Sequence, residues 1–218
     1  PLTRDDIIAE RVGVRPLAVA GEGGVADWVQ LSRKHVLEVD DAKRHMSIFG
    51  GKLTDCLNAG DEVAEQVAAL GVEVPEPGNH WYGEPGKDLR DEFMIQARRM
   101  KLDDMTDPSS SEPLSERFWR RYGESAFGLL ERIREDESQV ELLIENAEYT
   151  RGEIELAARR EMIVRLEDFM RRRSKIEQVV RNRDIAAAPG LREACELLFG
   201  EQAEQRLQEY LSGLNVTG

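Results

Sequence analysis

The chain has 218 residues, of which 33% are charged and 40% are hydrophobic, and its formal net charge is −13 at pH 7. This balance suits one or two globular domains with a hydrophobic core, and it argues against general nucleic-acid binding. The sequence has neither an apolar run of about 18 residues nor a signal-peptide pattern. We therefore expect a cytoplasmic protein, or one that is peripheral on the inner face of the cytoplasmic membrane.

The cysteines and histidines predict neither a disulfide framework nor a metal site. Cys56 and Cys195 are far apart and lie in helix-like segments, which favours two reduced thiols. His35, His45 and His80 have no recognised ligand spacing with each other or with Cys56. We therefore predict no metal.

The first predicted strand covers residues 7–17, where β-branched side chains alternate with a glycine and a proline. Thr3 is expected to cap a short turn over residues 4–6. Pro16 lacks a backbone donor and forces Arg15 out of the helical region, so the strand should end there or lie at a sheet edge. The guanidinium of Arg15 is then either a hydrogen-bond donor held in a fixed position or a solvated surface group.

Two further strand-like runs follow a glycine-containing loop at residues 18–26. They cover residues 28–39 and 46–49, with a polar turn at 40–43 between them. Three such strands would form a small antiparallel unit, which is marginal as an independent fold. We therefore expect this region to be part of a larger domain.

A double-glycine turn follows the third strand and opens a helix. Gly50 and Gly51 can adopt backbone conformations closed to other residues, and the first N–H groups of the helix lack an internal acceptor. Lys52 adds a mobile positive charge, and Thr54 adds a hydroxyl. On its own such a pattern is most often a plain turn, and the neighbouring segments are what favour a ligand-holding loop here.

The rest of the chain reads as helical. One helix runs from Leu53 to a stop at Gly71, and the proline- and glycine-rich stretch 72–86 is a predicted linker. The domains are therefore expected at 1–71 and 87–218. Ser115 is the expected cap of one helix in the second domain. The further helices are predicted at 88–102, 115–135, 139–147, 151–161, 163–181, 188–198 and 201–211.

A run of basic residues in the helical domain has two possible interpretations. Arg171 to Arg173, with Lys175, could meet a phosphate. Glu167 and Asp168 lie at helical spacing from these arginines, so ion pairs within the chain are the favoured reading.

Phe118 and Trp119 lie beside two arginines and could form a stacking surface, but burial in the core is favoured. No Ser-His-Asp grouping and no G-x-S-x-G elbow is visible. If the helical domain carries chemistry, its sequence does not show it.

Three segments together carry a family resemblance: residues 13–17 (GVRPL), 32–35 (SRKH) and 47–54 (SIFGGKLT). In order and spacing they resemble the last part of the catalytic region of FAD-dependent glycerol-3-phosphate dehydrogenases of the aerobic, membrane-associated type. The helical remainder resembles that family's C-terminal domain, notably over residues 148–176. Residues 55–57 (Asp-Cys-Leu) depart from the family's Thr-Tyr-Arg, which puts the contacts of that tyrosine and arginine in doubt.

The resemblance implies a mostly α fold: a small antiparallel β remnant of a flavoprotein catalytic domain, followed by an all-helical C-terminal domain. Related flavoproteins open with a strand and a G-x-G-x-x-G segment that binds the FAD pyrophosphate. No G-x-G-x-x-G occurs in this chain. We therefore expect a C-terminal fragment that is inactive alone and does not hold FAD firmly.

In the intact protein, the resemblance implies oxidation of sn-glycerol 3-phosphate to dihydroxyacetone phosphate, with electrons passed through FAD to quinone. Arg33 and Lys52 would bind the substrate phosphate, and Arg15 would bind substrate near the flavin and act in catalysis. The residues implied in cofactor binding are Gly50, Gly51, Lys52, Leu53 and Thr54.

Two other functions stay open. One is a glycerol-3-phosphate oxidase that uses oxygen, and the other is a non-catalytic helical module for assembly or membrane association. A homodimer and peripheral membrane contact are among the expected partnerships, the latter through a basic patch around residues 171–175.

Overall fold

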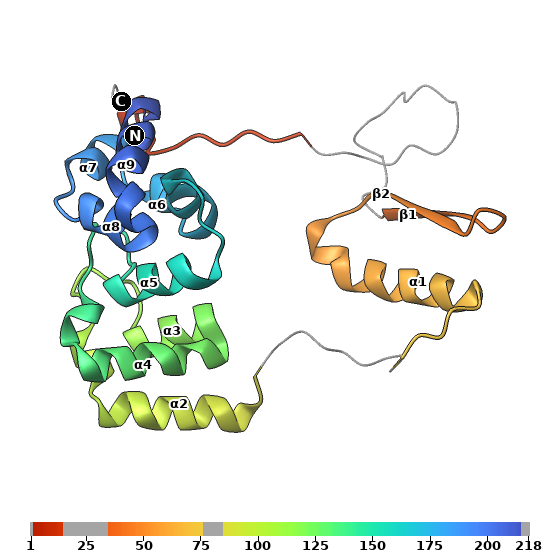
Figure 1. Ribbon diagram of the computed structural model, residues 1–218, viewed down its shortest axis with the longest axis horizontal. Coiled ribbons are helices and arrows are strands. Elements are labelled where there is room, and N and C mark those ends of the chain that lie inside the picture. The colour runs from red at the N-terminus through yellow and green to blue at the C-terminus, as the bar shows by residue number, and fades with distance from the viewer. Residues whose placement is uncertain (1, 15–34, 76–84, 215–218) are drawn as a thin grey trace. The chain divides into compact units, whose positions relative to one another are not determined.

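The computed structural model describes residues 2–14, 35–75 and 85–214 (Figure 1). The chain forms two compact units. One, the helical unit, combines Pro1–Glu10 with Gly83–Gly218, and the other, the hairpin unit, is Arg11–Tyr82. The predicted mostly α fold with an all-helical C-terminal domain is confirmed, whereas the predicted domain boundaries stay predictions.

Residues 2–14, the described part of the N-terminal segment, contain one short turn and no strand. Thr3 caps a 3-10 turn over Arg4–Asp6, with its N–H 2.7 Å and its hydroxyl 2.9 Å from Oδ2 of Asp6, as predicted. Residues 7–14 form neither helix nor strand, so the strand predicted at 7–17 is wrong over this part. Strand propensity alone is insufficient, and among the described residues no strand pairs with this segment. Residues 15–17 lie outside the described residues.

The hairpin unit contains two antiparallel strands, β1 (His35–Asp40) and β2 (His45–Gly50). Their register pairs His35 with Gly50 and Asp40 with His45. The strand predicted at 46–49 is confirmed, and so is the part of the 28–39 prediction that falls on 35–39. Residues 28–34 are not among those described.

Helix α1 (Cys56–Ala69) completes the hairpin unit and confirms the helix predicted after the double glycine. A 3-10 turn, Leu53–Asp55, precedes it, and Gly71 with φ +82° follows its end. No residue of α1 is buried. Among the described residues of this unit, only His35 is buried.

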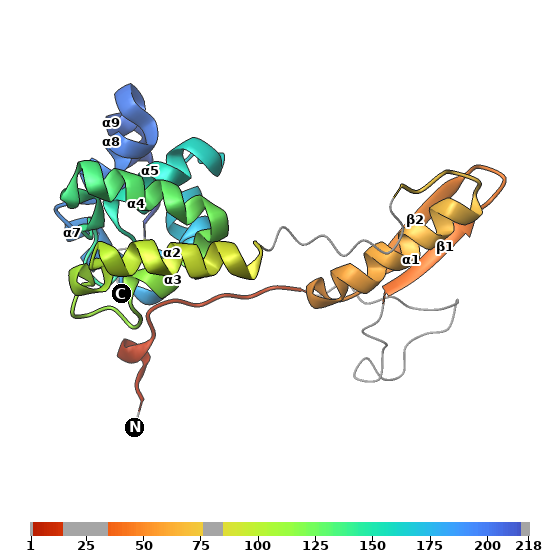
Figure 2. The same cartoon turned by 90° about the horizontal axis from the view of Figure 1, so that it is seen from below.

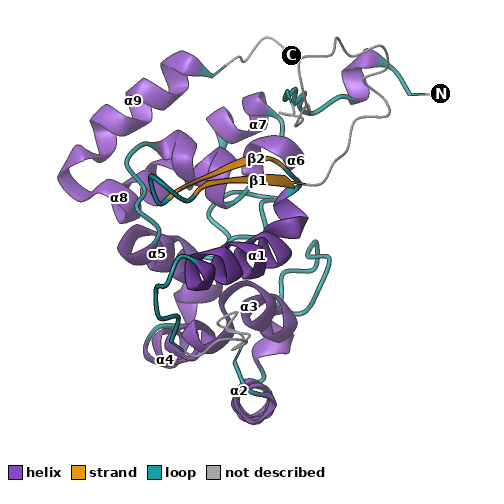
Figure 3. Cartoon of the chain, turned by 90° about the vertical axis from the view of Figure 1, so that its right-hand side faces the viewer, coloured by secondary structure: helices purple, strands orange, loops and turns teal. Residues whose placement is uncertain are grey.

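The helical unit contains two hydrophobic clusters. The first is built around Phe93, Phe118 and Leu130, and the second around Ile154 and Phe169. The views in Figures 1 and 2 show α2 lying alongside α3 and α4, and Figure 3 shows how strongly helices dominate. The described helices are α2 (Lys87–Arg99), α3 (Leu114–Tyr122), α4 (Ala126–Glu135), α5 (Arg151–Arg160), α6 (Ile176–Val179), α7 (Asn182–Ala187), α8 (Leu191–Phe199) and α9 (Ala203–Gly213).

Three of the predicted helices differ from the observed ones, each time where the backbone turns left-handed. The predicted helix 115–135 is divided at Gly123, which has φ +51°. The predicted helix 139–147 is a 3-10 turn followed by an irregular segment with Asn146 at φ +60°. The predicted helix 163–181 contains a π-helix, Asp168–Arg173, and is interrupted at Lys175 with φ +64°.

Ser115 is not a helix cap, contrary to the prediction. Pro113 occupies the cap position of α3, and Ser115 lies in the first turn. The N–H and hydroxyl of Ser115 donate to the two carboxylate oxygens of Asp103, at 2.9 and 3.0 Å. A carboxylate from the preceding turn therefore satisfies one of the orphan backbone donors of the helix start, the N–H of Ser115.

The basic run pairs with acids of its own chain, as predicted. Arg172 lies 2.9 Å from Asp168 and 3.1 Å from Glu167, and Arg171 lies 3.8 Å from Glu167. Arg173 lies 3.9 Å from Glu161.

The aromatic pair is part of the core, as predicted. Phe118 is fully buried, and Trp119 packs against the Phe93 ring with 5.4 Å between ring centroids. None of the described helices has both the length and the apolar character needed to cross a bilayer.

Candidate functional site

The double-glycine turn joins β2 to α1 and requires glycine at its second position. Gly50 and Gly51 have φ of +67° and +92°, a region that L side chains rarely adopt. A Cβ on Gly51 would also lie 3.0 Å from Cβ of His35. The chain therefore passes directly over His35 as it leaves the sheet, which only glycine permits without strain.

The residues after the glycines are presented to solvent. Lys52 is extended, with φ −101° and ψ 146°, and precedes the 3-10 turn. Lys52, Leu53 and Thr54 are all exposed. Because the first N–H groups of a helix have no intrahelical acceptor and carry partial positive charge, this turn offers backbone donors beside a cationic side chain. Such an arrangement suits an anion or an electron-rich ring edge.

His35 fixes this turn through two charged hydrogen bonds. Its Nδ1 lies 2.9 Å from Oδ2 of Asp55, and its Nε2 lies 2.9 Å from Oε2 of Glu62. An ionised carboxylate oxygen only accepts, so both hydrogen bonds are made when the imidazole carries a proton on each nitrogen. The hydrogen bond with Asp55, followed by that with Glu62, raises the pKa of His35 above its usual value of 6.5.

The sequence did not identify this role of His35. Asp55 and Glu62 are seven residues apart, close to two helical turns, so they lie on one face of α1. That spacing could have been recognised in the sequence, but it does not predict which strand residue contacts the two carboxylates. Asp55 is also where the chain departs from the family pattern, and here its carboxylate binds His35.

The structure brings together only part of the predicted site. Gly50, Gly51, Lys52, Leu53 and Thr54 form one continuous turn. Arg15 and Arg33 lie outside the described residues, so their convergence with Lys52 stays a prediction. The exposed thiol of Cys56 begins α1 directly after Asp55.

A second polar cluster, in the helical unit, was also missed. Glu153 is fully buried, and its Oε1 accepts hydrogen bonds from Arg121 at 2.7 Å and Tyr122 at 3.1 Å. Its Oε2 lies 3.9 Å from Arg117 and accepts 2.8 Å from the N–H of Thr150.

This cluster fastens the start of α5 to α3. Burial, and then the charge of Glu153, raise the pKa of Tyr122, so the phenol stays neutral and its O–H donates a hydrogen bond to the carboxylate. The Arg121 guanidinium lies 4.0 Å over the ring of Tyr149, a cation–π contact. The burial of Glu153 and its pairing with side chains of α3 indicate a structural role.

Comparison with known families gave one match. A family model described as the C-terminal domain of alpha-glycerophosphate oxidase matches residues 15–206. A search of curated proteins and a search of solved structures each found no match. The matched span contains the whole double-glycine turn and most of the helical unit.

Proposed function

This chain belongs to the family of the C-terminal domain of alpha-glycerophosphate oxidase, and from that premise we propose that it forms part of an FAD-dependent enzyme that oxidises sn-glycerol 3-phosphate to dihydroxyacetone phosphate. The match over residues 15–206 carries the proposal. Since the chain has no G-x-G-x-x-G segment, another region would bind the FAD pyrophosphate, and this chain alone would be inactive.

The double-glycine turn suits the edge of a flavin ring. The left-handed pair Gly50 and Gly51 leaves no side chain between the backbone and a ligand, and the N–H groups up to Thr54 are donors for ring carbonyl oxygens. When bound, FAD supplies the acceptor for the hydride from C2 of the substrate. The positive potential of the turn and of Lys52 would stabilise the negative charge that the ring gains.

The cationic side chains suit the substrate. Glycerol 3-phosphate carries a dianionic phosphate, for which a planar guanidinium fork and an ammonium are suitable partners. Arg33 and Lys52 are the proposed phosphate ligands. Arg15 is proposed to orient the substrate and to stabilise the negative charge that develops on its alcohol oxygen.

Quinone is the proposed electron acceptor, which would place the enzyme in peripheral contact with the inner face of the cytoplasmic membrane. Oxygen is the second candidate, because the description of the matched family names an oxidase. A non-catalytic helical module is the third function to be tested.

Reconstitution with an FAD-binding region tests the proposal. The joined protein should be yellow, and sn-glycerol 3-phosphate should bleach it when oxygen is excluded. A colourless protein, or one that the substrate does not bleach, would support the non-catalytic module instead. Oxygen uptake measured against quinone reduction then decides the acceptor.

Arg33→Ala in the reconstituted enzyme tests the phosphate ligand. Loss of one guanidinium contact to a dianion should raise KM about tenfold or more while flavin content stays unchanged. Arg98→Ala, a charge loss in the helical unit, is the matched control and should leave KM unchanged. An unchanged KM for Arg33→Ala would remove Arg33 from the site.

A further inference from the structure

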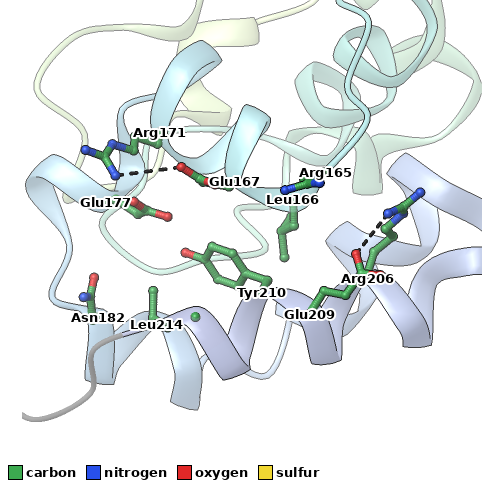
Figure 4. A pocket seen from close by; sticks show the side chains of 11 residues that line it. Arg165, Leu166, Glu167, Arg171, Glu177, Asn182, Arg206, Glu209, Tyr210 and Leu214 are labelled. Atoms are coloured by element: carbon green, nitrogen blue, oxygen red, sulfur yellow. Dashed lines mark hydrogen bonds and ion pairs between the residues drawn. The ribbon is translucent and has the colours of Figure 1, made fainter.

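A cavity of about 580 Å³ in the helical unit is lined by polar side chains that pair with one another (Figure 4). Nη1 of Arg206 donates to Oε2 of Glu209 at 2.9 Å. The hydroxyl of Tyr210 points toward Glu177 and is hydrogen-bonded to its carboxylate. These groups need no ligand. His35 of the hairpin unit is different, because it is a buried titratable group to which the proposed function gives no role.

His35 lies beneath the double-glycine turn. It begins β1, and its backbone pairs with Gly50 of β2. The residue is 5% exposed, and its Cβ would lie only 3.0 Å from a Cβ on Gly51. The turn that is assigned to the flavin therefore passes directly over this side chain.

The ring of His35 also holds the far end of the turn. Its Nδ1 lies 2.9 Å from Oδ2 of Asp55, and the N–H of Asp55 donates to the carbonyl oxygen of Lys52 at 2.9 Å. Its Nε2 lies 2.9 Å from Oε2 of Glu62 in α1. One residue therefore contacts the chain before the turn, at Gly50, after the turn, at Asp55, and in the helix that follows.

Burial does not hold the turn in place. All five residues from Gly50 to Thr54 are exposed, and Leu53 is 90% exposed. Glycine loses more conformational freedom on ordering than any other residue, so a double glycine is costly to fix. A loop that is already fixed in its bound conformation binds more tightly, because that freedom is not lost on binding.

We propose that His35 is a positioning residue for the flavin: its bridge between Asp55 and Glu62 fixes residues 50–54 in the conformation that presents their N–H groups to the edge of the ring. This inference rests on the proposed function and adds a residue that does not itself contact the cofactor. Asp55 stands where the family pattern has threonine, so the carboxylate of this bridge is a feature of this chain.

The bridge requires both ring protons. In the described part of the chain, the charged groups that act on the ring are Asp55 from the 3-10 turn and Glu62 from α1, while β2 places Gly50 opposite it. Hydrogen bonds with the two carboxylates raise the pKa of His35 above 6.5. A neutral imidazole has a single N–H and can donate to only one of them. The turn should therefore be held at low pH and released as the pH rises through the raised pKa.

The flavin affinity of the reconstituted protein tests the proposal. We expect the dissociation constant for FAD, measured by fluorescence titration, to rise about tenfold from about pH 6 to about pH 9. His35→Gln should bind FAD about tenfold more weakly at the lower pH and show no such rise. His45→Gln, the same change at the exposed far end of the hairpin, should leave both affinity and pH profile unchanged. Equal affinities and profiles for the two variants would overturn the positioning role and leave the proposed function intact.

A double-variant cycle separates the bridge from a general loss of stability. Asp55→Ala and His35→Gln each break the same contact, so the double variant should bind FAD no more weakly than the weaker single variant. Effects that multiply would show that the two residues act independently and would contradict the bridge.

Hydrogen exchange of this chain alone needs no cofactor. The N–H groups of Asp55 and Cys56 donate to carbonyl oxygens within the turn, at Lys52 and Leu53. Their exchange, corrected for its intrinsic pH dependence, should become several-fold faster over the same pH interval and should be fast throughout in His35→Gln. Exchange that does not depend on His35 would overturn the positioning role. A reconstituted protein that binds no FAD at any pH would instead refute the proposed function, and this inference with it.

Discussion

The two units of this chain differ in the interactions that stabilise each of them internally. The helical unit buries two clusters of apolar side chains, whereas among the described residues of the hairpin unit the one buried side chain is the charged His35. Burial of apolar surface is the main driving force of folding, so the helical unit has the means of stability that the hairpin unit lacks. The hairpin unit instead depends on its strand ladder and on the contacts of His35 with two carboxylates.

The apolar side chains of the hairpin unit remain largely uncovered. The large exposed ones near the strands and the double-glycine turn include Val36, Ile48, Phe49, Leu53 and Leu57. Exposed apolar residues of this kind next to a candidate cofactor turn are consistent with a unit that completes a larger domain.

The largest difference in the free energy of unfolding should come from replacing one phenylalanine by alanine in each unit. Phe118→Ala should lower the free energy of unfolding by about 4 kcal/mol, because the ring is fully buried in the first cluster. Phe49→Ala removes the same atoms from a residue that is 47% exposed, so its cost should be below about 1 kcal/mol. Denaturant unfolding followed by circular dichroism measures both, and equal costs would refute the contrast.

Loss of the buried carboxylate of Glu153 should lower the free energy of unfolding of the helical unit nearly as much. Glu153→Gln leaves Arg117 and Arg121 without their buried counter-charge and should cost about 3 kcal/mol. Glu116→Gln breaks an exposed pair with Arg90, 3.1 Å long, and should cost less than about 1 kcal/mol. Denaturant unfolding followed by circular dichroism measures both costs. A Glu153 variant as stable as the Glu116 variant would show that the cluster contributes little to the stability of the helical unit.

Two glycines of the hairpin unit should respond in opposite directions to alanine. Gly51→Ala combines a positive φ with a Cβ contact at 3.0 Å and should destabilise by about 1–2 kcal/mol. Gly60→Ala lies inside α1 with no atom within 4 Å of the new Cβ, and it should stabilise by about 0.5–1 kcal/mol. Hydrogen exchange of α1 amides reports both, and stabilisation by Gly51→Ala would contradict the observed turn.

The smallest effect should be a pH dependence confined to the hairpin unit. Because the folded-state pKa of His35 is raised, its contribution to stability is complete below the unfolded value near 6.5 and is lost as the pH rises through the folded value. Exchange in α1, corrected for its intrinsic pH dependence, should therefore become several-fold faster over that interval. His35→Gln should abolish this change, and a pH dependence that persists in the variant would exclude His35 as its source.

Features determined by local sequence could be predicted, whereas those determined by distant contacts could not. The double-glycine turn, α1 and the paired basic run all follow from residues a few positions apart. The strand expected over residues 7–14 did not form, and no strand in the described part of the chain pairs with it. The helix expected at 115–135 is divided at Gly123, which has a positive φ.

The buried side chains of His35 and Glu153 show the same limit for the candidate site and the core. His35 contacts residues 20 and 27 positions away, and Glu153 contacts Arg121 at a separation of 32. No local pattern specifies such pairs, because they depend on how strands and helices pack. The predicted turn from Gly50 to Thr54 was accessible because its five members are consecutive.

The most direct test of the central claim is the KM for sn-glycerol 3-phosphate of a reconstituted flavoenzyme carrying Lys52→Gln, compared with Lys43→Gln in the hairpin turn. Lys43 is the matched control because its side chain is 80% exposed and pairs with Asp40 at 3.0 Å, away from the double glycine. The account predicts that KM rises about tenfold or more for Lys52→Gln, with flavin retained, and stays unchanged for Lys43→Gln. Equal KM values for the two variants would contradict a substrate site at this turn.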